Sequence, residues 1–585
     1  MDPKKWAAIA AVLIFIWVGL SANLYPRDRN GNEAQYSLMR EVNNMIISIV
    51  TSSWPSSSNE VTTEPNNKPG HVLLSPNLST CHGSLTDEGR PIYCCPPKRE
   101  SDEPFIDFQF PDNTSLVRIR RPAQKVDKEY IAKYNRALSI MKSLPYDDPR
   151  SFWRQADVHC VFCSGAYNQL HSNHLLKIHR SWLFFPWHRM MLYFHERILG
   201  SLIGDDTFAL PFWNWDNPKG MLIPDMYLNG SFYDSQRESA HLPPQVADIN
   251  FDYVERGLGP EDQIEANIAF MYHQMVSGAK KTELFMGCPY KAGEEGFCDG
   301  PGTIELAPHN ALHTWVGNTQ NPERENLGAF YSAAKDPVFY AHHANIDRLW
   351  DVWTGLRGNK AEINDPDWLD SYFYFYDEKS QNVRIKIRDV LDMTKLRYTY
   401  EPIDNPWLNA RPMPSVPPKI ARHILKMRDS QNELQLSKKN LSPNFGPEGV
   451  TLDTTIRARV PRPKTHRTKK EKAEEEEILV VYGIEIKKDM YVKFDVFVNA
   501  VDETIIGPES REFAGTFVNM RRGVRIVMNK NDVVTKRKTN LKLGISELLE
   551  DLEADEDERI WVTLVPRAGT CINTTVDGVR IEYMR

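Results

Sequence analysis

The spacing of apolar residues predicts helices through the first two thirds of the chain. Between residues 126 and 144 apolar side chains fall three or four positions apart, which indicates an amphipathic helix with Asp127 as its N-cap. This apolar stripe consists of Ile131, Tyr134, Leu138 and Met141. Residues 182–200 and 337–353 have a similar apolar density, and Pro337 suits the first turn of a helix. We therefore expect a mainly helical domain in which a four-helix bundle encloses a common interior.

After Ile478 the pattern changes to an alternation of apolar and polar residues, with turns between the alternating runs. This period of two predicts strands, so we expect residues 478–585 to form a β-sandwich or barrel. The predicted strands are 478–486, 491–501, 513–520, 524–528, 560–566 and 579–584. Residues 402–477 are rich in proline and then in charge, and are predicted to be a flexible linker whose basic run 457–470 is exposed and disordered.

The N-terminus carries an unbroken apolar run, residues 6–20, directly after two lysines. This order is typical of secretory targeting. The run is short for a membrane span, which needs about 20 apolar residues, but extension to Tyr25 would give a single-pass anchor with its lysines in the cytoplasm. We interpret residues 1–25 as a signal peptide or membrane anchor, and residues 26–80 as a disordered stalk.

Length and charge change this picture little. A chain of 585 residues with 41% hydrophobic content can build several packed domains. The net charge of −7 argues against nucleic acid as a partner, because phosphate contacts need a concentrated positive face.

Histidines gather at two places in the helical region. His309 and His313 are four residues apart, so a helix would present both imidazoles from one face. The pair His342–His343 on the next predicted helix can supply a third nitrogen. An upstream group consists of His159, His179 and His188. Two such trios, each beside a dense aromatic run, predict two metal ions that face each other; residue type alone suits copper, zinc or iron.

Three segments carry most of these histidines: HCVFC, HRSWLFFPWHR and DPVFYAHHANIDRLW. They resemble the two copper motifs of plant polyphenol oxidases, the tyrosinase and catechol oxidase family. The resemblance runs from about Cys81 to the C-terminus and includes DWL at Asp367–Leu369, RYTYE at Arg397–Glu401 and KFDV at Lys493–Val496. It implies a catalytic domain over residues 81–401 with a binuclear type-3 site for two copper ions. One ion would be held by His159, His179 and His188, and the other by His309, His313 and His343, with His342 outside the ligand set.

The resemblance also assigns most of the eight cysteines. It implies the disulfides Cys81–Cys95 and Cys94–Cys160, and a thioether between Cys163 and His179 that would restrain the imidazole. We interpret Cys288 and Cys298 as an additional pair of this chain, whereas Cys571 has no evident partner. This use of cysteine agrees with an oxidising compartment.

Four further residues acquire roles through the resemblance. Glu305 and Asn310 stand where the family holds a water that could accept the proton of a monophenol, a general-base role. Phe330 corresponds to the gate residue over the second copper, and Thr314 is expected to line the entrance.

The reaction implied by the resemblance is the oxidation of o-diphenols to o-quinones with dioxygen, and hydroxylation of monophenols as a further activity. In the family the KFDV domain covers the copper site. We therefore expect a latent enzyme that becomes active when this domain is displaced, for instance by a protease.

Two alternatives stay open on the sequence. A hemocyanin-like carrier would bind dioxygen at the same histidines without oxidising phenols, although DWL and KFDV favour the oxidase. A pathway-specific hydroxylase or cyclising oxidase would act on one specialised phenolic. In each case Asn345 and Asp347 are expected to orient ligands or helix ends.

The N-terminus departs from the family, most members of which carry a Ser-rich chloroplast transit peptide and then a thylakoid-transfer segment. The first 25 residues resemble neither part. We therefore expect the lumen of the secretory pathway or the vacuole, with or without a membrane anchor, in preference to the thylakoid lumen.

We predict that a fluorescent fusion of the full chain enters the secretory pathway, because the lysines and the apolar run together form a targeting signal. Leu13→Arg, which interrupts that run, should leave the fusion in the cytosol. Import of the unchanged fusion into chloroplasts would refute this prediction. Release from membranes by alkaline carbonate would reject only the anchor.

Overall fold

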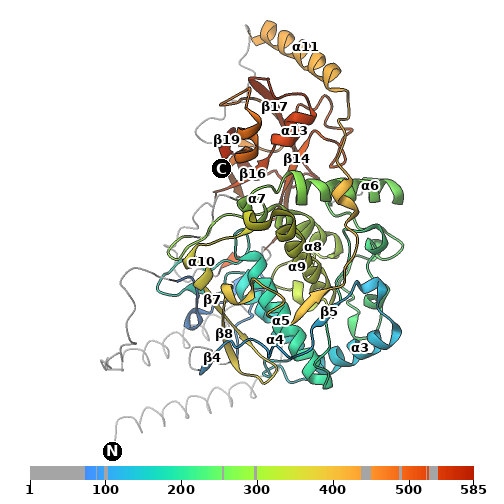
Figure 1. Cartoon of the computed structure of the whole chain (residues 1–585), viewed down its shortest axis with the longest axis vertical. Coiled ribbons are helices and arrows are strands. Elements are labelled where there is room, and N and C mark those ends of the chain that lie inside the picture. The colour runs from blue at the N-terminus through green and yellow to red at the C-terminus, as the bar shows by residue number, and fades with distance from the viewer. Residues whose placement is uncertain are drawn as a thin grey trace, which may run out of the picture. The chain divides into compact units, whose positions relative to one another are not determined.

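The helices predicted from the sequence are present in the structure, a computed structural model (Figure 1). The first is α3 (Lys128–Ser143), where Oδ1 of Asp127 accepts a hydrogen bond from the backbone N–H of Tyr130 at 2.7 Å. Four helices surround the histidines: α4 (Phe152–Cys163), α5 (Phe184–Ile203), α8 (Asn310–Val316) and α9 (Val338–Arg357). The mainly helical architecture of this part is therefore confirmed. The other helices are α6 (Pro260–Tyr272), α7 (Thr282–Met286), α10 (Pro366–Asp370), α11 (Pro418–Leu436), α12 (Lys469–Glu474) and α13 (Ser546–Asp551).

The structure describes residues 73–86, 89–97, 103–252, 256–295, 300–436, 449–486, 490–521, 524–525 and 538–585. The predicted targeting segment and the predicted stalk up to residue 72 lie outside these ranges. Across the described part of the chain, no helix has both the length and the apolar character that a membrane crossing requires.

Residues 73–80 were predicted to belong to the stalk, but they are folded. β1 (Pro76–Asn77) pairs antiparallel with β6 (Asn168–Gln169), and Leu74 is buried in the main core. The prediction was wrong here because a two-residue strand beside one buried leucine is too short to show any periodicity.

A buried ion pair joins α5 to α9. Nε of Arg189, the residue after His188, lies 2.5 Å from Oδ1 of Asp347, four residues after His343. Burial alone would raise the pKa of the Asp347 carboxyl, but the guanidinium groups of Arg189 and Arg120 hold this pKa below its usual value. The pair therefore stays charged and links the two helices next to their histidines.

The RYTYE motif completes this clamp. Its strand β9 (Tyr398–Tyr400) lies parallel to β5 (Arg118–Arg120), and the hydroxyls of Tyr398 and Tyr400 donate to Oδ2 of Asp347 at 2.7 and 2.6 Å. Arg118 and Arg120 of β5 also reach Glu196 of α5, at 2.7 and 2.8 Å. The short strands therefore tie both site helices to one buried charge network. The remaining strands of the helical part are β2 (Ser84–Leu85), β3 (Pro91–Ile92), β4 (Phe105–Asp107), β7 (Tyr372–Tyr376) and β8 (Asn382–Lys386).

The C-terminal part consists of two antiparallel sheets around an apolar core, which confirms the predicted β-rich fold. One sheet has the order β10-β18-β12-β16 with β19 also paired to β12, and the other has the order β11-β17-β13-β14. These strands are β10 (Val450–Thr451), β11 (Ile456–Pro461), β12 (Glu476–Ile486), β13 (Val492–Val498), β14 (Phe513–Asn519), β16 (Lys538–Gly544), β17 (Arg559–Pro566), β18 (Thr574–Val576) and β19 (Gly578–Met584). β15 (Val524–Arg525) instead pairs with β2 of the helical part.

The basic run 457–470 was predicted to be exposed and disordered, and this prediction is wrong. β11 pairs with β17 along its whole length, and its side chains alternate between buried and exposed. Arg462 is buried and forms a bidentate ion pair with Glu477 at 2.7 and 2.9 Å. The high charge concealed a strand whose apolar members, Ile456, Ala458 and Val460, face the core.

The KFDV motif makes a buried contact between the two parts. Lys493 on β13 is fully buried, and its Nζ lies 2.9 Å from Oδ1 of Asp495 and 3.2 Å from Oδ1 of Asn250 in the helical part. An ammonium group that is removed from water needs such partners. The motif therefore fixes the sandwich against the segment around Asn250.

Asp248 lies in this segment and carries an unfavourable charge. Its Oδ1 accepts from the backbone N–H of Asn250 at 3.1 Å, but its buried Oδ2 has no hydrogen-bond partner among the described residues. Burial, together with the nearby Asp252, raises the pKa of Asp248 to about 6. The unfolded value is about 4, so the folded protein binds this proton more tightly and loses stability as the pH rises from 4 to above 6.

We predict that Asp248→Asn raises the free energy of unfolding at pH 7 by up to about 3 kcal/mol and has little effect at pH 4. Denaturant unfolding at both pH values measures the difference. The exposed Asp453 supplies a control, since Asp453→Asn should change neither curve. An equal gain from Asp248→Asn at both pH values would show that its charge is not the cause.

Candidate metal centre

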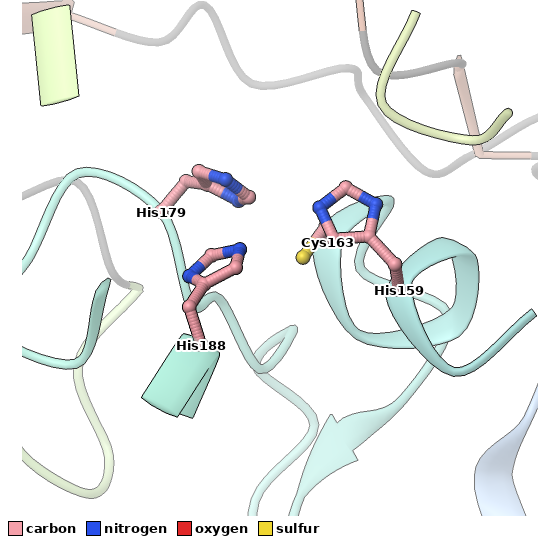
Figure 2. Close-up of side chains that lie close together, drawn as sticks. All are labelled: His159, Cys163, His179 and His188. Carbon is pink, nitrogen blue, oxygen red and sulfur yellow. The ribbon is translucent and has the colours of Figure 1, made fainter. Parts of the chain in front are cut away.

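Two groups of buried side chains meet between α4, α5, α8 and α9. His159, Cys163, His179 and His188 form the first group, with potential ligand atoms within 4.8 Å of one another. His309, His313, His342 and His343 form the second group within the same distance. In Figure 2 the three imidazoles of the first group and the sulfur of Cys163 point toward a shared space. His159 and Cys163 come from α4, His188 comes from α5, and His179 precedes α5.

The two groups face each other at close range. The rings of His188 and His343 stack with centroids 4.4 Å apart, and those of His179 and His309 are 5.6 Å apart. The arrangement suits two ions held side by side. The second group contains the three predicted ligands His309, His313 and His343. His342 is a fourth imidazole at the same distance.

Backbone carbonyl groups orient four of the rings. A carbonyl oxygen only accepts, so the Nδ1 atom that it contacts carries the proton, and Nε2 keeps its lone pair for a metal. The pairs are His159 with Phe330 (2.9 Å), His188 with Phe184 (2.7 Å), His309 with Glu305 (3.2 Å) and His313 with Leu327 (2.7 Å). Among the described residues, the buried Nε2 atoms of His159, His188 and His309 have no hydrogen-bond partner. Such orphaned nitrogens fit a metal site.

Burial keeps these imidazoles neutral. It lowers the pKa of His188 to about 3 and that of His313 to about 4. Burial also holds the pKa values of three others well below 6.5: His159, His309 and His343. Since a metal binds the deprotonated nitrogen, the site is ready to bind at neutral pH. Uncharged imidazole donors suit copper among the transition metals.

Phe330, the predicted gate, lies against the first histidine group. Its ring centroid is 4.3 Å from that of His179 and 6.2 Å from that of His159, whereas the distance to His309 is 6.4 Å. On its other side Phe330 packs with Tyr491 and Met520 of the C-terminal part. The ring is therefore enclosed between the histidines and the β-sandwich.

The end of β14 and the residues after it cover the site; we call residues 517–521 the cap segment. Nδ2 of Asn310 donates to the carbonyl oxygen of Val518 at 3.2 Å, and the backbone N–H of Phe330 donates to that of Arg521 at 3.2 Å. The cap segment thus contacts residues beside both histidine groups.

Two side chains hold the cap segment in place. The guanidinium of Arg521 lies 2.7 Å from a carboxylate oxygen of Glu323, and the hydroxyl of Tyr491 donates to the carbonyl oxygen of Glu323 at 2.6 Å. Glu323 itself is almost fully buried. These contacts hold the β-sandwich over the site.

The predicted substrate-directing residues lie close to the second group. Oε1 of Glu305 accepts from the backbone N–H of Arg180 at 2.6 Å, and Oδ1 of Asn310 is buried without a hydrogen-bond partner among the described residues. Thr314 is buried, and its hydroxyl donates to the carbonyl oxygen of Asn310 at 3.0 Å, within its own helix. Glu305 and Asn310 therefore flank His309, whereas Thr314 faces its helix backbone.

Disulfides fix the frame of the first group. The structure contains Cys81–Cys95 and Cys94–Cys160, the pairs that the family resemblance implies. Because Cys160 follows His159, the second bond anchors α4 at its histidine. Cys288 is also disulfide-bonded, and Cys298, its predicted partner, lies outside the described residues. In the sandwich the buried Cys571 donates through Sγ to the carbonyl oxygen of Lys493 at 3.1 Å.

Three family models match consecutive parts of the chain: the common central domain of tyrosinase at residues 149–356, the polyphenol oxidase middle domain at 362–413, and the chloroplastic polyphenol oxidase C-terminal domain at 448–583. Aureusidin synthase of Antirrhinum majus is 45% identical over 522 residues, which cover 87% of this chain and 88% of that protein. The chain belongs to the plant polyphenol oxidase family. A chloroplastic polyphenol oxidase of Malus domestica is 44% identical over 517 residues, with 87% and 84% coverage.

Solved structures of polyphenol oxidases share this fold. Latent apple tyrosinase superposes with a TM-score of 0.72 at 42% identity and covers 82% of this chain and all of its own. A latent aurone synthase superposes with a TM-score of 0.77 at 35% identity and covers 88% of this chain and 99% of its own. Both comparisons include the helical part and the β-sandwich.

Membership in the family decides the class of this protein. It is a polyphenol oxidase of the catechol oxidase or tyrosinase type with a binuclear copper cofactor. It oxidises o-diphenols with dioxygen and is latent until the C-terminal domain is displaced. The carrier interpretation is set aside, because the chain matches the middle and C-terminal domains of the oxidases as well as the copper domain.

Sequence reasoning did not find the residues that cover the site. The strand 513–520 was predicted, but no local pattern shows that its end contacts Phe330 or that Tyr491 reaches Glu323, almost 170 residues away in the chain. Such contacts depend on how the sandwich docks.

We predict that the double variant Tyr491→Phe, Arg521→Gln raises catechol oxidation by the latent protein about tenfold without an activator. It removes a buried hydrogen bond and an ion pair that hold the cap segment, and each 1.4 kcal/mol lost from the closed state increases the open population about tenfold. Dioxygen uptake at matched copper content measures this. Lys538→Gln is the control, since it breaks an ion pair with Asp577 inside the sandwich (2.7 Å). Equal latency of the double variant and this control would contradict the assignment.

Proposed function

We propose that this polyphenol oxidase binds one copper through His159, His179 and His188 and the other through His309, His313 and His343. The observation that carries the proposal is the pair of facing, buried, neutral histidine groups, four of whose rings are oriented by backbone carbonyls. His342 lies behind this set, between His309 and the rings of Trp213 and Trp215. A thioether between Cys163 and His179 would fix the imidazole of His179, and their placement in one group supports it.

When bound, the two copper ions supply dioxygen chemistry and a Lewis acid for the phenol oxygen. The chain supplies the rest. Phe330 presents an aromatic face beside His179, against which a phenol ring can stack once the cap segment leaves. Aromatic rings beside the histidines, such as Phe184 and Phe339, keep bulk water from the walls of the opened site, which protects a reactive quinone-forming step from side reactions.

Glu305 would serve as the base for monophenols. It is almost fully buried beside His309, and Asn310 has an amide oxygen that needs a donor, so the two can hold a water between them. That water would take the proton of a monophenol and pass it toward Glu305. Hydroxylation then precedes oxidation to the o-quinone.

A second candidate is a pathway-specific oxidase or hydroxylase. Aureusidin synthase of Antirrhinum majus and (+)-larreatricin hydroxylase of Larrea tridentata match this chain at 45% and 44% identity, as closely as the apple polyphenol oxidase does. A broad substrate panel with product masses distinguishes one specialised phenolic from general o-diphenol oxidation.

The compartment belongs to the proposal as well. The lysines and apolar run at the N-terminus support the secretory pathway or vacuole, with or without a membrane anchor, whereas several relatives are named as chloroplastic. Activation by a protease is a further part of it. Because β10, β11 and α12 belong to the sandwich, a cut that frees the sandwich must fall before Val450.

We expect His343→Ala to lose about half of the bound copper and all catechol oxidation, because one imidazole of the second trio is missing. His342→Ala should keep both coppers and part of the activity. Copper content by elemental analysis, together with dioxygen uptake, separates the two variants. If His343→Ala kept both coppers and His342→Ala lost one, His342 and not His343 would be the third ligand of the second copper.

The activated enzyme should hydroxylate monophenols more slowly than it oxidises o-diphenols. Glu305→Gln should lower the ratio of monophenol to diphenol turnover about tenfold or more, since a general base contributes on the order of 10² to 10⁴ in rate. A panel of matched monophenols and diphenols, followed by dioxygen uptake and product mass, measures the ratio. An unchanged ratio would remove Glu305 from the proton transfer.

A further inference from the structure

Arg180 places a guanidinium group at the covered mouth of the copper site. It directly follows His179, so its backbone lies within one residue of the site. The residue adopts a φ of 69°, in the left-handed region that non-glycine residues rarely occupy, and its N–H is held by Oε1 of Glu305 at 2.6 Å. The φ angle and this hydrogen bond together fix the backbone of Arg180, and they therefore set the direction in which its side chain extends.

The side chain of Arg180 contacts the cap segment. Its guanidinium donates a hydrogen bond to Oδ1 of Asn519 and lies 5.9 Å from the ring centroid of Phe517. Val518, between these two residues, is the one that accepts from Asn310, and Met520 packs on Phe330. The cap segment therefore runs from Arg180 to Phe330 across the same opening.

Displacement of the sandwich removes both of these contacts together with the cover over Phe330. The guanidinium then faces the opened mouth, where a carboxylate is the strongest replacement acceptor because it can bind in a bidentate, charge-assisted manner. The replacement would lie at the mouth, beside the ring that stacks on the phenol.

We propose that Arg180 is a specificity-determining residue which, in the opened enzyme, binds the carboxylate of phenols that carry an acidic side chain. The inference rests on the proposed function and deepens it, because it names anionic phenolic acids as the preferred substrate class. In the latent form the cap segment occupies the same guanidinium, so the closed state also hides the determinant of specificity.

The test compares 3-(3,4-dihydroxyphenyl)propanoate with its uncharged methyl ester. Full-length, copper-loaded protein is opened by a brief acid treatment, returned to neutral pH, and assayed by dioxygen uptake. We expect Arg180→Gln to lower the acid-to-ester ratio of kcat/KM about tenfold or more, mainly through a higher KM for the acid, because one charge-assisted contact is lost. Arg180→Lys should retain part of the preference. Added salt should lower the ratio in the unchanged protein but not in Arg180→Gln.

Arg256→Gln is the matched control. Arg256 also contacts the sandwich, through an ion pair with Glu509 at 2.9 Å, so this variant removes one guanidinium from the interface but not the one beside His179. Its acid-to-ester ratio should equal that of the unchanged protein. Equal ratios in the unchanged protein and Arg180→Gln would overturn the inference.

Calorimetric binding of 3-phenylpropanoate and 3-phenylpropanamide gives a readout that needs no turnover. Binding of the anion that is weakened by Arg180→Gln and not by Arg256→Gln supports the inference. If neither the acid nor the ester is oxidised while this Arg180-dependent binding persists, the proposed function fails but the carboxylate site at Arg180 is retained. If the ester is oxidised and anion binding does not depend on Arg180, the proposed function stands and the inference fails.

Discussion

The ion pair between Arg189 and Asp347 is the constraint on which the copper site depends. Arg189 directly follows His188 on α5, and Asp347 lies one turn after His343 on α9. The pair is buried, and two tyrosine hydroxyls donate hydrogen bonds to Asp347. Removal of one partner from a buried pair typically costs about 3–5 kcal/mol, since the other charge is left without compensation. The clamp thus links α5 and α9 beside histidines that are more than 150 residues apart in sequence.

The same logic explains why the RYTYE and DWL segments accompany the copper motifs. RYTYE supplies the hydroxyls that satisfy Asp347, and Trp368 of DWL donates through Nε1 to the carbonyl oxygen of Trp182, three residues after His179. Both segments support the site from outside the ligand set. The β-sandwich covers the site through polar contacts such as those of Tyr491 and Arg521, and through apolar residues such as Phe513 and Val518 that pack in the main core. Reversible latency requires that these contacts be exchanged for water when the sandwich leaves.

The sequence was sufficient for the helices and for the histidine groups because both have local signals. The helical stripe of α3 and the spacing of His309 and His313 are periodic patterns, and the motif residues around them are specific. Contacts made across the chain had no such signal. β11 was missed because Arg457 and Arg459 point to solvent between buried residues, which makes an edge strand look like a charged linker. The cap segment and Arg180 could not be paired, since their meeting depends on the docking of two separately folded parts.

The central claim is that the two histidine groups form one coupled binuclear copper site. Copper analysis combined with electron paramagnetic resonance of the oxidised, full-length protein tests it most directly, because two cupric ions this close couple through a bridging ligand and lose their signal. The account predicts two copper ions per chain and almost no cupric resonance. One copper per chain, or a resonance whose intensity accounts for all the copper present, would contradict it.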